Sequence, residues 1–178
     1  KAGMRVAICD QLEDPKMTKS IVKRGVTELI TPGVSLNDEV LQSKTNNFLA
    51  AVHFNKKQLG ISFLDVSTGE YLVAQGSAEY IDKLLQNFNP SEVLVQKQNK
   101  QEFLEFFENR YYTFYLDDWV FQPEYANETL QNHFEVKSLK GFGIQDLKNG
   151  IVAAGAVLYY LSETQHNQLK HIQNIQRI

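Results

Sequence analysis

Three strand-like segments with very short connections limit the fold more than any other feature of the sequence. The segments lie at residues 48–54, 58–66 and 70–75. The turns between them read Asn-Lys-Lys at 55–57 and Ser-Thr-Gly at 67–69. Connections this short join antiparallel neighbours, because a parallel pair needs a crossover of a dozen residues or more. The sequence therefore predicts an antiparallel three-stranded start to a sheet.

Helices and strands alternate after this meander. Apolar spacing predicts a helix at about 78–88 with Ser77 as its N-cap, and Pro90 separates it from a strand at 92–96. A second helix follows Asn99, a strand covers 111–116, and a third helix covers about 123–134. The predicted order is β-β-β-α-β-α-β-α, which indicates an α/β fold with a mixed five-stranded sheet and helices packed on it. That order is typical of ribonuclease H-like folds.

Both flanks of this unit have a different character. Residues 1–31 contain two short strands, at 5–9 and 26–30, around a polar loop, and residues 32–44 are polar and predict a linker. A long apolar helix begins near Asn149 and carries small residues at 153–156 that allow close approach of a neighbour. Residues 1–3 resemble the end of a helix with a glycine stop, so we expect the chain to be an internal fragment of a longer protein.

The charge distribution argues against nucleic-acid binding by the central unit. The chain has a net charge of −3, but residues 48–134 carry 6 basic and 12 acidic side chains, a net charge of −6. Phosphate binding draws much of its free energy from Lys and Arg. Cys9 is the only cysteine, so no disulfide can form within the chain, an intracellular location is expected, and its apolar neighbours predict a buried core position. The longest apolar run, at 151–161, is about half of a membrane span.

Catalytic and metal-binding patterns are missing from the sequence. It contains no G-x-x-x-x-G-K-[ST] loop, no H-E-x-x-H motif and no G-x-S-x-G motif, and no histidine has a cysteine at zinc-ligand spacing. A metal-dependent nuclease of ribonuclease H-like fold needs converging carboxylates, yet the strand at 48–54 carries none. We interpret the remaining candidates as turn and surface carboxylates: Asp65, Glu70, Asp117 and Asp118. A nuclease and a stand-alone nucleic-acid-binding module remain the alternative functions.

Three stretches of the chain resemble the MutS family of DNA mismatch repair proteins. The first is RVAICDQ at 5–11 with EDP at 13–15, VKR at 22–24 and VTELITPG at 26–33. The second is NFLAA at 47–51 with LDVSTGE at 64–70. The third is GFG at 141–143 with AAGA at 153–156, ETQ at 163–165 and HI at 171–172. Their order and spacing are similar to those of the family along essentially the whole chain.

The resemblance implies a division into parts. Residues 1–31 would be the C-terminal part of mismatch-binding domain I, and 32–44 a linker. Residues 45–136 would be connector domain II, ribonuclease H-like but without nuclease activity. Residues 137–178 would begin core and lever domain III. No catalytic, cofactor-binding or metal residue is expected in the fragment, which is not expected to be an enzyme.

The resemblance also implies a role and partners. The fragment would be the connector that couples mismatched-DNA binding to an ATPase, with ATP and Mg²⁺ bound elsewhere in a full-length, homodimeric, cytoplasmic bacterial protein. It would contact a MutL-type protein, and mismatched duplex DNA through the full-length protein, but no membrane. Lys23 and Arg24 are the candidates for DNA-backbone contact. The candidate partner face is formed by polar residues of the helix at 123–134: Asn127, Glu128, Gln131 and Asn132.

Overall fold

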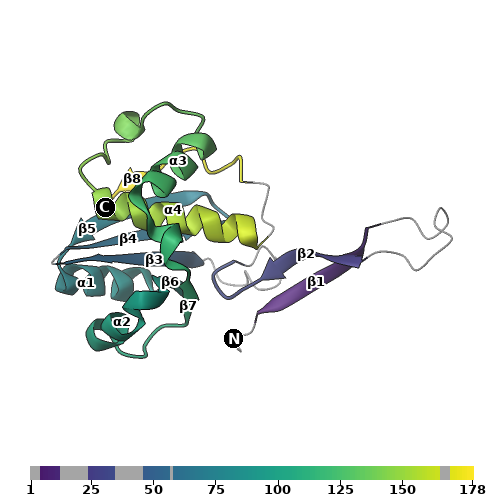
Figure 1. The fold of residues 1–178 in the computed structure, drawn as a ribbon, viewed down its shortest axis with the longest axis horizontal. Helices are drawn as coiled ribbons and strands as arrows, with labels where there is room; N and C mark the ends of the chain where they lie inside the picture. The colour runs from purple at the N-terminus through teal and green to yellow at the C-terminus, as the bar shows by residue number, and fades with distance from the viewer. Residues whose placement is uncertain (1–4, 13–23, 35–45, 57, 165–168) are drawn as a thin grey trace.

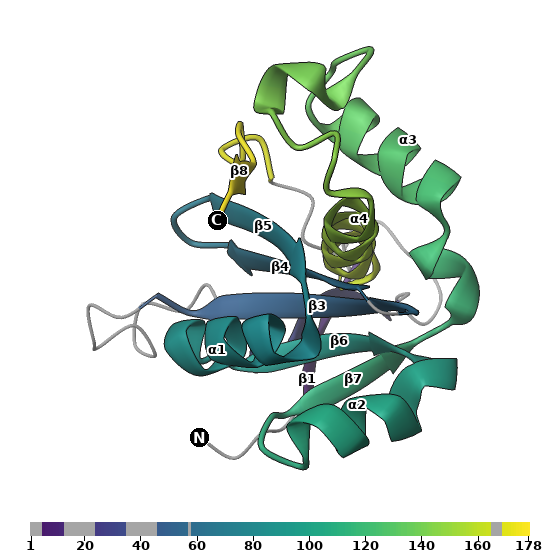
Figure 2. The ribbon, with the colours of Figure 1, turned by 90° about the vertical axis from the view of Figure 1, so that its left-hand side faces the viewer.

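A six-stranded mixed sheet with helices on both faces forms the body of the protein (Figures 1 and 2). The computed structural model describes residues 5–12, 24–34, 46–56, 58–164 and 169–178. The strand order is β7-β6-β3-β4-β5-β8. The α/β class with a mixed sheet agrees with the expectation from sequence.

The predicted meander is confirmed. Strand β3 (Phe48–Asn55) pairs antiparallel with β4 (Gln58–Asp65), which pairs antiparallel with β5 (Glu70–Gly76). Beyond β3 the sheet becomes parallel, through β6 (Glu92–Gln96) and β7 (Thr113–Leu116). The short turns give the antiparallel half, and the helical crossovers give the parallel half.

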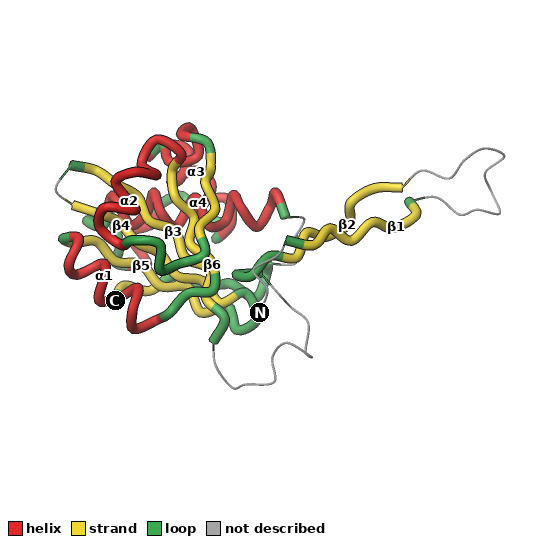
Figure 3. Tube along the Cα trace, turned by 90° about the horizontal axis from the view of Figure 1, so that it is seen from below, coloured by secondary structure: helices red, strands yellow, loops and turns green. Residues whose placement is uncertain are grey.

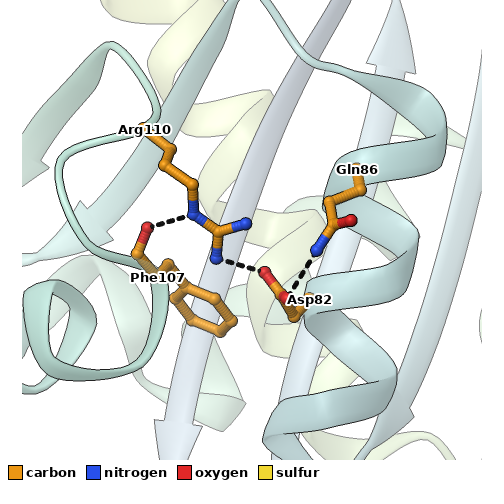
Figure 4. Close-up of polar contacts among 4 residues, drawn as sticks. All are labelled: Asp82, Gln86, Phe107 and Arg110. Carbon is orange, nitrogen blue, oxygen red and sulfur yellow. Dashed lines mark hydrogen bonds and ion pairs between the residues drawn. The ribbon is translucent and has the colours of Figure 1, made fainter.

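Two helices cover one face of the sheet. Helix α1 (Ala78–Phe88) has the predicted bounds, and its N-cap Ser77 accepts a hydrogen bond from the Tyr80 backbone N–H. Helix α2 (Lys100–Phe107) follows a short 3-10 helix, η1 (Lys97–Asn99). Arg110 ties the two helices together, because its guanidinium donates to the Phe107 carbonyl at 2.9 Å and to Asp82 of α1 at 2.6 Å (Figure 4).

The other face is covered by a long helix with a second helix outside it. Helix α4 (Lys148–Glu163) lies on β3 and β4, and α3 (Pro123–His133) packs against α4 (Figure 2). A Cβ added to Gly155 would lie 2.5 Å from the Ala126 Cβ. The small residues predicted to allow close approach of a neighbour therefore do so at the α3–α4 contact.

The sheet has one strand more than predicted. Strand β8 (Gln176–Arg177) pairs parallel with the edge of β5, where Leu72 faces Gln176. This strand consists of two exposed polar residues, so it has no periodic pattern from which it could be predicted. A third 3-10 helix, η3 (Leu139–Phe142), connects α3 to α4, and η2 (Asp118–Phe121) precedes α3.

The segment from residue 137 packs differently from the expected start of a separate domain. Twelve residues of α4 are buried, and the apolar cluster on this face includes Val73 of β5 and Val157 of α4. The helix is apolar on most sides because it lies between the sheet and α3. Residues 137–164 and 169–178 therefore belong to the same packed unit as the sheet.

A two-stranded hairpin, which we call the arm, projects from one end of the sheet (Figures 1 and 3). Strand β1 (Val6–Gln11) pairs antiparallel with β2 (Arg24–Ile30), with Val6 opposite Ile30. Both strands are longer than predicted. Val6 and Val26 are each 51% exposed, because among the described residues no helix covers the arm.

Candidate functional site

The base of the arm meets the sheet around a buried acidic residue, Glu92. Its residue exposure is 0%, and it begins strand β6. Its Oε2 accepts hydrogen bonds from the Thr31 hydroxyl at 2.5 Å and the Gly33 backbone N–H at 3.1 Å. Its Oε1 accepts from the Tyr160 hydroxyl of α4 at 2.8 Å. One carboxyl group therefore joins the arm, the sheet and α4, and we call this group of residues the junction.

The short segment after β2 lies directly on the sheet. Thr31 and Val34 bond to each other's backbone in both directions, and Val34 is fully buried. A Cβ on Gly33 would lie 2.8 Å from the Glu92 Cβ and 2.9 Å from Leu49 Cδ1. The close approach of backbone to sheet therefore requires glycine at position 33. Residues 32–34 of the expected linker are packed, whereas residues 35–45 lie outside the described residues.

Arg5, directly before β1, attaches the first strand of the arm to the sheet beside the junction. Its guanidinium carbon lies 4.0 Å from the centre of the Phe114 ring and 5.7 Å from that of Tyr160. This is cation–π geometry on the edge strand β7. Farther along, the Leu29 backbone N–H donates to the Thr164 carbonyl at the end of α4, at 3.2 Å. Both strands of the arm are thus attached to the body.

The electrostatics of the junction keep its tyrosine protonated. Burial raises the pKa of Tyr160 well above its ordinary value, and the charge of Glu92 raises it further. A tyrosine in this state can only act as a neutral hydroxyl, so it donates to Glu92 throughout the physiological pH range.

Sequence reasoning missed the junction. Composition predicts a linker at 32–44, and apolar pattern predicts a strand at 92–96, but neither assigns a role to Thr31 or Glu92. The available signal was an acidic side chain directly before the apolar run Val93–Val95. Such a residue is rarely buried unless it is hydrogen-bonded.

The sequence-predicted contact residues lie in two places. Lys23 lies outside the described residues, and Arg24 begins β2 with a side chain that is also outside them. On α3, Glu128 and Asn132 are exposed, whereas Asn127 and Gln131 are half-buried and line a hollow beside α4. The expected partner face is therefore divided between an exposed side and a sheltered side.

The carboxylates considered for nuclease chemistry have other partners. Asp65 is the last residue of β4 and is buried, so its interpretation as a turn or surface carboxylate was wrong, and it accepts hydrogen bonds from Ser67 and from the Asn47 backbone. Asp117 pairs with Lys97, and Asp118 accepts from the Gln98 backbone N–H. Among the residues that the structure describes, no three His, Cys, Asp or Glu side chains are grouped to hold a metal ion.

Cys9 is exposed rather than buried, so the sequence interpretation was wrong at this position. Its neighbours Ala7 and Ile8 are apolar, but Ala7 is exposed as well. A two-stranded ribbon buries a side chain only where another layer covers it. Local apolar pattern alone could not reveal the missing layer.

His53 on β3 makes stability depend on pH. Its ring stacks on Phe121 at 5.9 Å, and burial lowers its pKa from 6.5 to about 4. His53 therefore binds a proton more tightly in the unfolded chain than in the folded chain. The free energy of unfolding is highest above pH 6.5 and decreases as the pH falls toward 4. We expect the free energy of unfolding to fall by about 2 kcal/mol between pH 7 and pH 5 through this group.

Urea denaturation at the two pH values, with His53→Phe as the comparison, measures this effect. The variant keeps an aromatic ring against Phe121 and should lose about 2 kcal/mol less than the wild-type chain over the same interval. Equal losses in the two proteins would contradict the assignment to His53.

Comparisons with known proteins find similarity along the whole chain. The family described as MutS domain II matches residues 47–173, and MutS domain I matches residues 1–39. DNA mismatch repair protein MutS of Flavobacterium psychrophilum is 70% identical over all 178 residues, which are 21% of that protein. Those of Flavobacterium johnsoniae and Bacteroides thetaiotaomicron are 72% and 59% identical over the same length, 20% and 21% of those proteins. The chain thus spans about a fifth of these relatives. No helix in the described part of the chain is long and apolar enough to cross a membrane.

Proposed function

The chain belongs to the MutS family of DNA mismatch repair proteins, and from this we propose that its sheet unit is the connector of a longer mismatch repair protein. The connector would couple the binding of mismatched DNA, on the side of the arm, to ATP hydrolysis in a domain beyond this chain. The observation that carries the proposal is the junction, in which buried Glu92 bonds to the arm and to α4.

The junction is suited to transmit a displacement. The arm is attached at Arg5, Leu29, Thr31 and Gly33, all at its base. A movement of its far end would therefore act on β6 and α4, elements of the packed core. Such cores respond to small shifts by moving between discrete packings rather than by deforming gradually.

The charge of the sheet unit supports an indirect role in DNA binding. With a net charge of −6 over residues 48–134, it repels a polyanion. We propose that the longer protein, acting in the cytoplasm as a homodimer, binds mismatched duplex DNA through other parts, with ATP and Mg²⁺ in a separate domain.

A ribonuclease H-like fold without nuclease chemistry is part of the proposal. The strand order β7-β6-β3-β4-β5, antiparallel in the meander and parallel beyond β3, supports it. The absence of an acid on β3 and the engagement of Asp65 in a turn favour the connector over the nuclease.

We propose α3 as the face for a MutL-type partner. Glu128 and Asn132 are exposed on this helix, and Asn127 and Gln131 border the neighbouring hollow. Ala126 and Leu130 are fully buried and hold the helix on α4, so the polar side is presented on a fixed support.

The coupling is tested with Thr31→Val in the longer protein that contains this chain. The substitution removes one hydrogen bond to Glu92 with little change in shape. We expect the increase in ATP turnover caused by mismatched DNA to fall by about threefold or more, while affinity for the mismatch changes little, because the junction carries the coupling. ATP turnover and duplex binding are measured side by side.

Glu128→Lys serves as the matched control in the same experiment. Glu128→Lys should leave the DNA-dependent ATP turnover intact and weaken capture of a MutL-type protein. Thr31→Val should reduce the response of ATP turnover to mismatched DNA and leave that capture intact. If Thr31→Val leaves the response to mismatched DNA unchanged, the junction does not couple the two activities. If Glu128→Lys leaves capture unchanged, α3 is not the partner face.

A further inference from the structure

A hollow of about 390 Å³ lies where the end of β3, α3, the η3 loop and the start of α4 come together. Ligand-binding pockets in proteins begin at about this size. The polar lining is dominated by side-chain amides, which come from Asn55, Asn127, Gln131, Gln145 and Asn149.

Part of this amide lining is already used to build the wall. Asn149 accepts from the Asn55 amide at 3.1 Å and donates to the Gln58 carbonyl at 3.0 Å, so it ties α4 to the β3–β4 turn. Asn127 donates to the Pro123 carbonyl of its own helix. Within the described part of the chain, the amides of Gln131 and Gln145 make no such bond and remain open to a ligand.

The hollow has a positively charged side chain at its rim. Among the residues that the structure describes, Lys148 is its one charged side chain, and no carboxylate lines it. Asp146, two residues before Lys148, pairs with Arg177 at 2.8 Å. Among the described residues the hollow is therefore positive and free of carboxylates, although residues 48–178 carry 11 basic and 15 acidic side chains, a net charge of −4.

A histidine nitrogen beside the hollow is buried and unpaired among the described residues. His53 lines the hollow, and its Nδ1 is buried without a hydrogen-bond partner among the described residues. Burial of a polar nitrogen without a partner is costly, so such atoms are uncommon in folded proteins.

We propose that this hollow binds a short extended segment of a partner protein, with an acidic side chain of the segment directed at Lys148. Side-chain amides carry one donor group and one acceptor, as a peptide group does, so Gln131 and Gln145 match the main chain of such a segment. Lys148 supplies the complement to its carboxylate. The inference rests on the proposed partner role of α3, because Gln131 belongs to both surfaces.

Binding of peptides to the isotope-labelled chain, followed by amide chemical shifts, tests the inference. The probes are the acetylated and amidated peptide Gly-Ser-Glu-Ser-Gly and its counterparts with Gln or Lys at the centre. We expect shifts at the residues lining the hollow, and binding of the Glu peptide about fivefold or more tighter than that of the Lys peptide. Sodium acetate at the same concentration should not reproduce the shifts.

Lys148→Glu provides the matched variant, with Lys140→Glu as its control. Both lysines are exposed, but Lys140 does not line the hollow. Lys148→Glu should weaken binding of the Glu peptide by about fivefold or more and strengthen binding of the Lys peptide. Lys140→Glu should change the binding of neither peptide.

Three results would overturn the inference: equal binding of the three peptides, shifts away from the hollow, or the full effect with acetate alone. Each leaves the proposed function standing if Glu128→Lys still weakens capture of a MutL-type protein. Conversely, if peptides bind in the hollow while Glu128→Lys leaves capture of a MutL-type protein unchanged, the hollow is a peptide-binding site, but α3 is not the wider partner face.

Discussion

Replacing Glu92 with alanine is expected to lower the free energy of unfolding by about 3–5 kcal/mol. The change removes the shared acceptor of three donors: the Thr31 hydroxyl, the Gly33 backbone N–H and the Tyr160 hydroxyl. The site is fully buried, so water cannot readily replace the lost bonds. Each donor left unpaired costs about 1–3 kcal/mol.

Urea denaturation and limited proteolysis measure the two consequences. Unfolding should occur at lower urea concentration, and the arm should be cleaved from the body faster because its attachment at Thr31 and Gly33 is lost. Glu105→Ala is the control, since Glu105 is exposed on α2, and it should change stability by less than about 0.5 kcal/mol. A similarly small loss for Glu92→Ala would show that the junction does not stabilise the fold.

Gly60→Ala is the second substitution expected to have a large effect, about 3 kcal/mol or more. A Cβ at this position of β4 would lie 2.0 Å from both the carbonyl carbon and the oxygen of Asn149, and 2.5 Å from the Gly150 nitrogen. These are backbone atoms of the first turn of α4, so no side-chain rotation can relieve the clash. The helix would have to move away from the sheet.

Gly141→Ala is a matched control for this substitution. A Cβ at Gly141 has no atom within 4 Å, and neither Gly60 nor Gly141 has a positive φ. Alanine at position 141 should therefore leave the free energy of unfolding unchanged or raise it by about 0.4–1 kcal/mol, because it lowers the conformational entropy of the unfolded chain. Thermal unfolding of both variants is the measurement, and equal midpoints would refute the close contact of β4 with α4.

The movement of α4 gives Gly60→Ala a second observable. Asn149 donates through its side chain to the Gln58 carbonyl and through its backbone to the Gln75 side chain. If α4 is displaced, both bonds lengthen, and amide hydrogen exchange should accelerate at the start of the helix. An unchanged exchange rate there would place the strain elsewhere.

Local features of the sequence determined most of the elements and their order. The turns at 55–57 and 67–69 are too short for anything but antiparallel pairing, and β3, β4 and β5 follow them. Ser77 and the apolar spacing after it place α1 at its observed bounds. These predictions succeed because turn length, capping and periodicity act between residues close in the chain.

The junction was decided by tertiary structure. Glu92 is buried because Thr31 and Gly33, about 60 residues earlier, and Tyr160, 68 residues later, converge on it. No local pattern encodes such a meeting, since its hydrogen bonds exist only after the arm and α4 have packed on the sheet. The same holds for the hollow, whose lining comes from β3, α3, the η3 loop and α4.

The remaining differences have a common physical cause. Cys9 and α4 both lie in or near apolar sequence, yet Cys9 is exposed on an uncovered ribbon and α4 is buried between two layers. Apolar pattern reports which side chains favour burial, and together with the motifs it let the sequence alone determine the α-helices, every strand except β8, and the family of this protein. Whether another layer is present to bury a given side chain depends on contacts between distant segments, and only the tertiary structure decided that.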